Sequence, residues 1–170
     1  NLGNVIKVVE LIALIKPSDT KYYIGNTRAA DIAFNRLSPE EKQKVTNYNT
    51  LEEALLNVAA LDQITKKIGE LSSLSNTYFD DVANLQAEYK KLPSALKNQV
   101  TNYTILTNAE KDIKAVQSVI KLIGTIDASV RTFESKVIAA RKAYDKLTEV
   151  QRPLVSNIRL LEQYERTLGL

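Results

Sequence analysis

The sequence predicts an all-α fold in which three tandem helical-bundle repeats of about 55 residues are joined by shared long helices into an elongated array. Two observations predict it: the chain matches itself at a period of 55, and apolar residues recur at helical spacing within each copy. A third supports it, because five Gly and four Pro among 170 residues are too few for the many turns of a sheet-rich fold. The predicted domains are the repeats 1–58, 59–113 and 114–170.

The self-similarity rests on positions that carry the same kind of residue in all three copies without a gap. Three copies in one register are unlike chance similarity, and they account for nearly the whole length of the chain. The recurring sets are Tyr23/Tyr78/Phe133, Phe34/Tyr89/Tyr144, Leu37/Leu92/Leu147, Val45/Val100/Val155, Asn47/Asn102/Asn157 and Leu51/Leu106/Leu161.

Two apolar stripes with alternating spacings of three and four residues predict two packed helices in each copy. The first stripe of the second copy comprises Leu61, Ile64, Ile68 and Leu71, and in the third copy it comprises Val116, Val119, Ile123 and Ile126. The gap-free period places Ile6, Val9 and Ala13 at the same positions of the first copy. The second stripes are Tyr23–Thr27–Ala30–Phe34–Leu37, Tyr78–Val82–Leu85–Tyr89–Leu92 and Phe133–Val137–Ala140–Tyr144–Leu147.

Capping residues predict a short third helix that begins near residues 39, 94 and 149. Ser38 and Glu41 have the spacing of a capping box, and Thr148 and Gln151 repeat the pattern. The second copy has Pro93 instead, which still prevents the preceding helix from continuing. Each short helix is expected to stop near the recurrent Asn residues, Asn47, Asn102 and Asn157, which we interpret as turn residues because Asn tolerates the left-handed conformation. The alternative is an amide that binds a ligand.

The apolar periodicity runs unbroken through 50–71 and 105–123, which predicts long helices that finish one repeat and begin the next, as in spectrin-like arrays. Loops are expected near 16–20, 72–76 and 126–129. The tyrosines on the stripes are predicted to lie in the core. Tyr48 and Tyr103 follow the recurrent Asn, where core contacts are favoured over an exposed surface for sugars or partners.

The residues that are absent restrict the chemistry. Without His, Cys, Met or Trp, the chain has no Cys/His zinc site, haem or iron–sulfur ligation, thiol nucleophile or His-based triad. Paired carboxylates remain, but adjacent helical residues point about 100° apart and do not converge on one substrate. The candidate pairs, Glu40/Glu41, Glu52/Glu53 and Asp80/Asp81, are each predicted to lie in the first turn of a helix, where the dipole favours acids. We expect no enzyme, no catalytic or metal-binding residues and no cofactor.

The third copy resembles a helical repeat common in surface and secreted proteins of Gram-positive bacteria. The matching residues within Thr132–Glu165 are Val137, Ala140, Arg141, Ala143, Tyr144, Asp145, Leu147, Thr148, Gln151, Leu154, Val155, Asn157 and Leu161. The other two copies keep fewer of them, and Pro153 departs from the pattern and is expected to shorten its helix. The resemblance implies an accessory module of an S-layer-associated, wall-bound or secreted multidomain protein, with an extracellular or cell-surface location.

Basic residues accumulate in the third repeat. Residues 114–170 hold ten basic and six acidic side chains, whereas the two preceding segments are balanced to within one charge. The candidate polymer-binding residues are Arg131, Lys136, Arg141, Lys142, Lys146, Arg152 and Arg159. They suit an anionic wall polymer or a surface protein. A mixed-charge, solvated helix surface is the alternative. Nucleic acid is not expected, since acids alternate with bases.

The leading prediction is therefore a non-catalytic structural spacer, with a binding module for an anionic wall polymer or a protein partner as the alternative. The chain begins at Asn1 without Met, so we expect a piece of a longer polypeptide whose other domains are its natural partners. The most apolar run, Val8–Ile15, contains Glu10 and is far shorter than the ~20 residues needed to span a bilayer, so no membrane insertion is expected.

Overall fold

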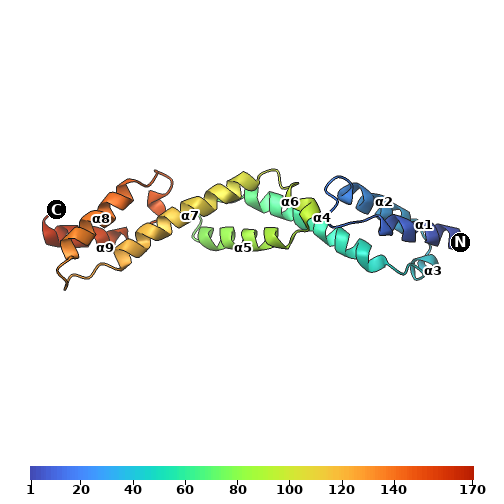
Figure 1. The fold of residues 1–170 in the computed structure, drawn as a ribbon, viewed down its shortest axis with the longest axis horizontal. Helices are drawn as coiled ribbons and strands as arrows, with labels where there is room; N and C mark the ends of the chain where they lie inside the picture. The colour runs from blue at the N-terminus through green and yellow to red at the C-terminus, as the bar shows by residue number, and fades with distance from the viewer. The chain divides into compact units, whose positions relative to one another are not determined.

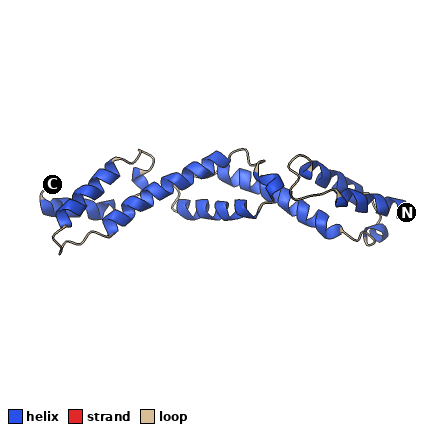
Figure 2. Ribbon diagram, viewed as in Figure 1, coloured by secondary structure: helices blue, strands red, loops and turns tan.

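The computed structural model describes residues 1–170 and confirms an all-α protein, with nine α-helices, one 3₁₀ helix and no strands (Figure 2). The residues divide into two compact units. One comprises Asn1–Leu71 and Ala83–Thr104, and the other comprises Ser72–Val82 and Ile105–Leu170. The domain boundaries predicted at 58/59 and 113/114 remain predictions.

The first unit contains α1 (Leu2–Ala13), α2 (Tyr23–Asn35), the short α3 (Pro39–Lys42) and the long α4 (Tyr48–Gly69). Helices α1, α2 and α4 pack against one another (Figure 1). The larger part of α5 (Tyr78–Lys91) and the short α6 (Ser94–Lys97) complete the unit, and α6 packs against α4.

The second unit contains most of α7 (Tyr103–Gly124), together with α8 (Phe133–Asp145), the 3₁₀ helix η1 (Arg152–Leu154) and α9 (Ile158–Leu168). Its core is one cluster of buried apolar side chains from α7, α8 and α9 and from the segments that join them. The second apolar stripe supplies Val137, Ala140 and Leu147, as the periodicity predicts.

The apolar stripe of α1 differs from the prediction by one residue. Its buried side chains are Val5, Val8 and Ile12, followed by Ile15, whereas Ile6 is half exposed. The placement of Ile6, Val9 and Ala13 in the core is therefore wrong. The cause is one additional residue in the first loop: eight positions separate Ile15 from Tyr23, but seven separate the corresponding residues of the later copies. One inserted residue turns a helix by about 100°, which brings a different stripe to the core.

The short helices begin at the predicted positions in two of three copies. Ser38 and Glu41 form the predicted capping box at α3, and α6 begins at Ser94. Thr148 and Gln151 exchange the predicted reciprocal hydrogen bonds, of 3.0 and 3.2 Å. The prediction of an α-helix from residue 149 is nevertheless wrong, because the 3₁₀ helix η1 forms instead at Arg152–Leu154. Pro153 has no N–H to donate to the fourth residue before it, so the α pattern cannot continue there.

The recurrent Asn residues are not left-handed turn residues, since no residue other than Gly has a positive φ. Each stands directly before α4, α7 or α9 and donates from its side-chain amide to a helix carbonyl 37 or 38 residues earlier. These bonds join Asn47 to Val9 at 3.0 Å, Asn102 to Thr65 at 2.8 Å and Asn157 to Ile120 at 2.9 Å. The Asn therefore connects the start of one helix to the C-terminal half of another.

Both predicted long helices are continuous, because α4 and α7 each contain 22 residues. Loops occur where the periodicity breaks, between α1 and α2, α4 and α5, and α7 and α8. The early start of α4 at Tyr48 corrects one expectation: Glu52 and Glu53 lie in its second turn rather than its first, so they do not cap it. Glu40/Glu41 and Asp80/Asp81 do lie in the first turns of α3 and α5.

Candidate functional site

The basic residues predicted to bind a polymer do not form one cluster. Arg131 precedes α8 and Lys136 lies in its first turn, while Lys142 and Lys146 lie one helical turn apart at its other end. Lys136 and Lys146 are ten positions apart, a rise of about 15 Å along a helix. Arg159 is on α9. These five side chains are exposed and take part in no ion pair. They are dispersed over the surface and form neither a cluster nor a pocket.

Arg141 takes part in contacts within the protein. Its Nε and Nη2 donate to the two carboxylate oxygens of Glu165 at 2.8 and 2.6 Å, which is bidentate geometry. Its Nη1 lies 3.6 Å from the Asp145 carboxylate, and its guanidinium lies 5.1 Å from the centre of the Tyr144 ring. The hydrogen bonds from Arg141 lower the pKa of Glu165, although partial burial opposes the shift. The pair thus holds α8 and α9 together, and it is not available to a ligand.

Arg152 also has a structural contact. Its Nη2 donates to the carbonyl of Asp145 at 2.8 Å, near the end of α8. Its Nε is buried without a hydrogen-bond partner. Of the seven candidate residues, two are therefore used by the fold, and Arg131, Lys136, Lys142, Lys146 and Arg159 remain available for an anionic partner.

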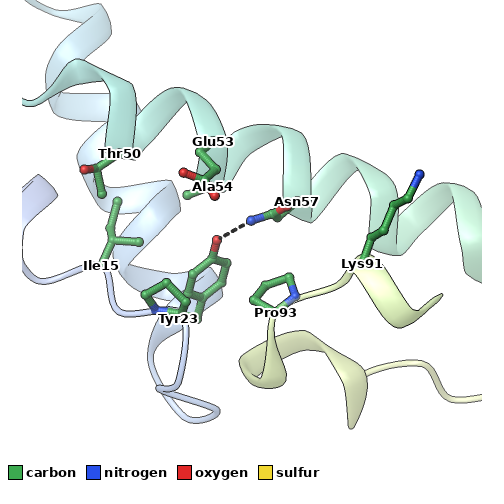
Figure 3. Close-up of a pocket in the computed structure, with 9 residues that line it drawn as sticks. Ile15, Tyr23, Thr50, Glu53, Ala54, Asn57, Lys91 and Pro93 are labelled. Atoms are coloured by element: carbon green, nitrogen blue, oxygen red, sulfur yellow. Dashed lines mark hydrogen bonds between the residues drawn. The ribbon is translucent and has the colours of Figure 1, made fainter. Parts of the chain in front are cut away.

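A cavity of about 260 Å³ lies in the first unit, beside the middle of α4 (Figure 3). Apolar side chains from the first loop, α2, α4 and the start of α6 form part of its wall. Polar groups line the remainder. The lining residues are Ile15, Pro17, Tyr23, Thr50, Glu53, Ala54, Asn57, Lys91 and Pro93.

The central polar contact of this cavity is already satisfied. The Tyr23 hydroxyl accepts a hydrogen bond of 3.0 Å from the side-chain amide of Asn57, and Tyr23 itself is only 2% exposed. In Figure 3, the Lys91 ammonium points away from Tyr23. Glu53 is exposed and has no ion-pair partner. The cavity is a gap beside a buried tyrosine rather than a cluster of convergent reactive groups.

Tyr48 and Tyr103 lie in partly buried aromatic stacks. Tyr48 stacks on Phe34 with 4.6 Å between ring centres, and Tyr103 stacks on Tyr89 at 4.1 Å. The ammonium of Lys42 lies 5.4 Å from the Phe34 ring centre, and an equivalent lysine, Lys97, lies 5.8 Å from that of Tyr89. The same cation and aromatic pair thus recurs 55 residues later. These rings contribute packing and cation–π attraction, which favours core contacts over a free sugar-binding surface.

The recurrent Asn amides also have a structural contact. The nitrogen of each donates to a helix carbonyl, and the oxygens of Asn47, Asn102 and Asn157 are buried without a partner. None of these residues lines the cavity beside α4. A ligand could therefore reach none of them without displacing an existing contact.

The carboxylates are distributed singly or in local caps. Glu41 accepts a 3.0 Å hydrogen bond from the backbone of Ser38, and Asp81 accepts one of 2.9 Å from Thr77. No group of three or more acidic side chains has an arrangement that could hold a metal ion. No helix is both long and apolar enough to cross a membrane.

The sequence does not predict the cavity beside α4. The apolar stripe predicts Tyr23 as a core residue, and no motif marks Asn57. The cavity depends on Pro17 and Pro93, which are 76 positions apart, and on the way the first loop approaches α6. The apolar periodicity within one copy does not indicate that the first loop lies close to α6.

In comparisons with known proteins, no family model, curated protein or solved structure matches this chain.

Proposed function

We propose that this chain is a non-catalytic spacer module, an elongated array of three helical repeats in a bacterial cell-surface or secreted protein. One observation carries the proposal: α4 and α7 run without a break through residues 58/59 and 113/114, where the repeat period places the boundaries. A continuous helix leaves no flexible linker at either boundary, so adjacent repeats would transmit a load from one to the next. The cell-surface location rests on the resemblance of the third copy to repeats of such proteins.

Small-angle X-ray scattering on the whole chain tests the spacer directly. A compact globule of 170 residues has a radius of gyration of roughly 15–16 Å. The spacer predicts a clearly larger radius and an asymmetric distance distribution. A radius within the globular range would overturn the proposal, because three repeats folded onto one another could not separate two attachment points.

A second candidate function is attachment to an anionic wall polymer. The observation that favours it is the set of five exposed, unpaired basic side chains: Arg131, Lys136, Lys142, Lys146 and Arg159. Such exposed charges would attract a polyanion most strongly at low ionic strength, because salt screens exposed charges over about 8–10 Å.

Co-sedimentation with purified cell walls tests attachment. The double variant Lys142→Gln/Lys146→Gln should reduce binding at low salt, and high salt should release the unmodified protein. The matched control is Lys7→Gln/Lys44→Gln, which removes two exposed charges from the first repeat. Failure of the unmodified chain to bind at low salt, or an equal loss in the control, would contradict a role for the third repeat.

A further inference from the structure

The short helix α6 lacks a cap of its own. Its N-cap residue is Pro93, which has no side-chain oxygen to accept from the first-turn N–H groups. The equivalent helix α3 has the Ser38 hydroxyl for this purpose, and the third copy has the reciprocal pair Thr148 and Gln151. The first N–H groups of a helix have no acceptor within the helix, and α6 is buried at Ala95 and Leu96. An external acceptor is therefore required.

That acceptor comes from the first loop. The backbone N–H of Ala95 donates to the carbonyl of Pro17 at 2.9 Å, and the Ser94 hydroxyl lies 3.3 Å from the same oxygen. Two donors of α6 thus converge on one carbonyl that is 77 or 78 positions earlier in the chain. In α3 the corresponding residue, Glu40, has no hydrogen bond from its N–H.

The loop that presents Pro17 is itself held in place. The Asp19 carboxylate accepts from the backbone N–H groups of Lys21 and Tyr22 at 3.1 and 3.0 Å. Asn26 donates from its side-chain amide to the carbonyl of Leu14 at 3.2 Å. This loop is also the one that contains an additional residue, compared with the loops before α5 and α8. The extra length and the local hydrogen bonds place the Pro17 carbonyl over α6.

We infer that the loop 14–22 is a strap, whose Pro17 carbonyl replaces the missing cap of α6 and fastens this helix to the first loop. Release of that single carbonyl would free α6 and uncover Leu96 and the cavity bounded by Pro17 and Pro93, before α1 or α2 melts. The strap makes the order of α6 depend on the folding of the first two helices. The purpose of the strap rests on the proposed spacer function. In such a spacer, the strap would fasten the first two repeats together at their junction.

Amide hydrogen exchange on the full chain, followed by NMR, tests the strap. The Ala95 amide should exchange about tenfold or more slowly than the amide of Glu40, although both lie at the same position of a four-residue helix. Asp19→Ala removes the carboxylate that holds the loop through the N–H groups of Lys21 and Tyr22, and it keeps the loop length and therefore the register of α1. It should raise the exchange rate at Ala95 by about tenfold and leave the buried Ala30 of α2 protected.

A second variant keeps the test decisive if Asp19→Ala also unfolds α2. Ser94→Ala removes one of the two donors to Pro17, and Ala95 exchange should rise severalfold. Ser118→Ala, an exposed serine of α7, is the matched control and should leave the Ala95 rate unchanged. Equal exchange at Ala95 and Glu40 in the unmodified chain would overturn the strap. Ala95 protection that survives Asp19→Ala with α2 intact would also overturn it, and so would an unchanged Ala95 rate in Ser94→Ala. A compact radius in scattering would refute the spacer while leaving these exchange rates unaffected.

Discussion

The middle of α4 and the middle of α7 have similar surroundings, but different polar contacts lie beside them. Beside the middle of α4, the neutral pair Tyr23 and Asn57 shares one hydrogen bond next to an open cavity. Beside the middle of α7, the equivalent of Asn57 is Asp112, whose carboxylate accepts a 2.8 Å hydrogen bond from the side-chain amide of Gln151. The position 55 residues before Gln151 is the fully buried, apolar Leu96.

The difference shows which features the two regions share and which vary between them. Both regions keep a 22-residue helix and a buried tyrosine, Tyr23 or Tyr78. A carboxylate at the second region needs a donor, because a partly buried charge without a hydrogen bond is costly. Burial, with the Asp112 charge as the second cause, raises the pKa of Tyr78. Helix continuity is therefore the shared feature, and the polar contacts around it vary.

The largest expected effect comes from breaking both long helices in the same way. Ala59→Pro in α4 and Lys114→Pro in α7 occupy equivalent mid-helix positions. Each should cost about 3 kcal/mol or more, because proline removes a helical hydrogen bond and clashes with the carbonyl four residues earlier. Thermal unfolding followed by circular dichroism should show lowered or split transitions for both variants.

Ser73→Pro is the control for the helix-breaking pair, since Ser73 lies in the loop between α4 and α5. It should cost well under 1 kcal/mol, because no helical hydrogen bond is lost there. Three substitutions of equally small effect would show that neither helix couples its neighbours.

A smaller effect should separate the two polar contacts. Gln151→Ala leaves Asp112 without its donor and also removes the bond to the Thr148 N–H, so we expect a loss of about 2–3 kcal/mol. Asn57→Ala removes one neutral hydrogen bond to Tyr23, for about 0.5–1.5 kcal/mol. Urea unfolding measures both. If Asn57→Ala lost more unfolding free energy than Gln151→Ala, the neutral contact would be the stronger one, contrary to this account.

The smallest effect concerns stability in acid, and it compares another pair of positions that are 55 residues apart. Arg141 stands where the second copy has Gln86, a buried amide whose nitrogen has no partner. The Glu165 pKa is lowered by Arg141, so the ion pair stabilises the protein above the ordinary pKa of a glutamate, 4.5, and this contribution is lost as the pH falls through the lowered value.

Glu165→Gln should therefore destabilise the protein at neutral pH by about 1 kcal/mol, a value reduced by solvent screening because both side chains are partly exposed. The difference from the unmodified protein should shrink below pH 4. Urea unfolding at pH 7 and pH 3 provides the comparison, and a difference that persists unchanged at pH 3 would mean that the ion pair is not its source.

Much of the fold could be predicted, because helical periodicity and caps are local properties of the sequence. The long helices, the three loops and the capping box at Ser38 are confirmed for that reason. The register of α1 could not be read from the period alone, since one extra residue in a loop shifts a stripe without changing its pattern. Likewise, Pro153 signals a break but not the 3₁₀ geometry that follows it.

The candidate site was less predictable because its properties depend on distant partners. By expected exposure and charge, Arg141 and Lys142 are equivalent candidates. In the structure, however, Arg141 is hydrogen-bonded to Glu165, which is 24 positions away. The cap that Pro17 supplies to α6 joins segments 77 or 78 positions apart, and no pattern within either segment indicates it. Long-range pairing of this kind becomes visible only in the folded chain.

The central claim is that a single unbroken helix crosses each repeat boundary, and a distance between two spin labels tests it most directly. The chain has no Cys, so labels can be placed at two new cysteines without a background signal. Asn49 and Lys66 are exposed and lie on either side of the 58/59 boundary, 17 positions apart in α4. A continuous helix predicts a narrow distribution near the axial rise of about 25 Å, broadened only by the label tethers. A broad distribution, or one centred well below that value, would show a joint at the boundary and contradict the claim.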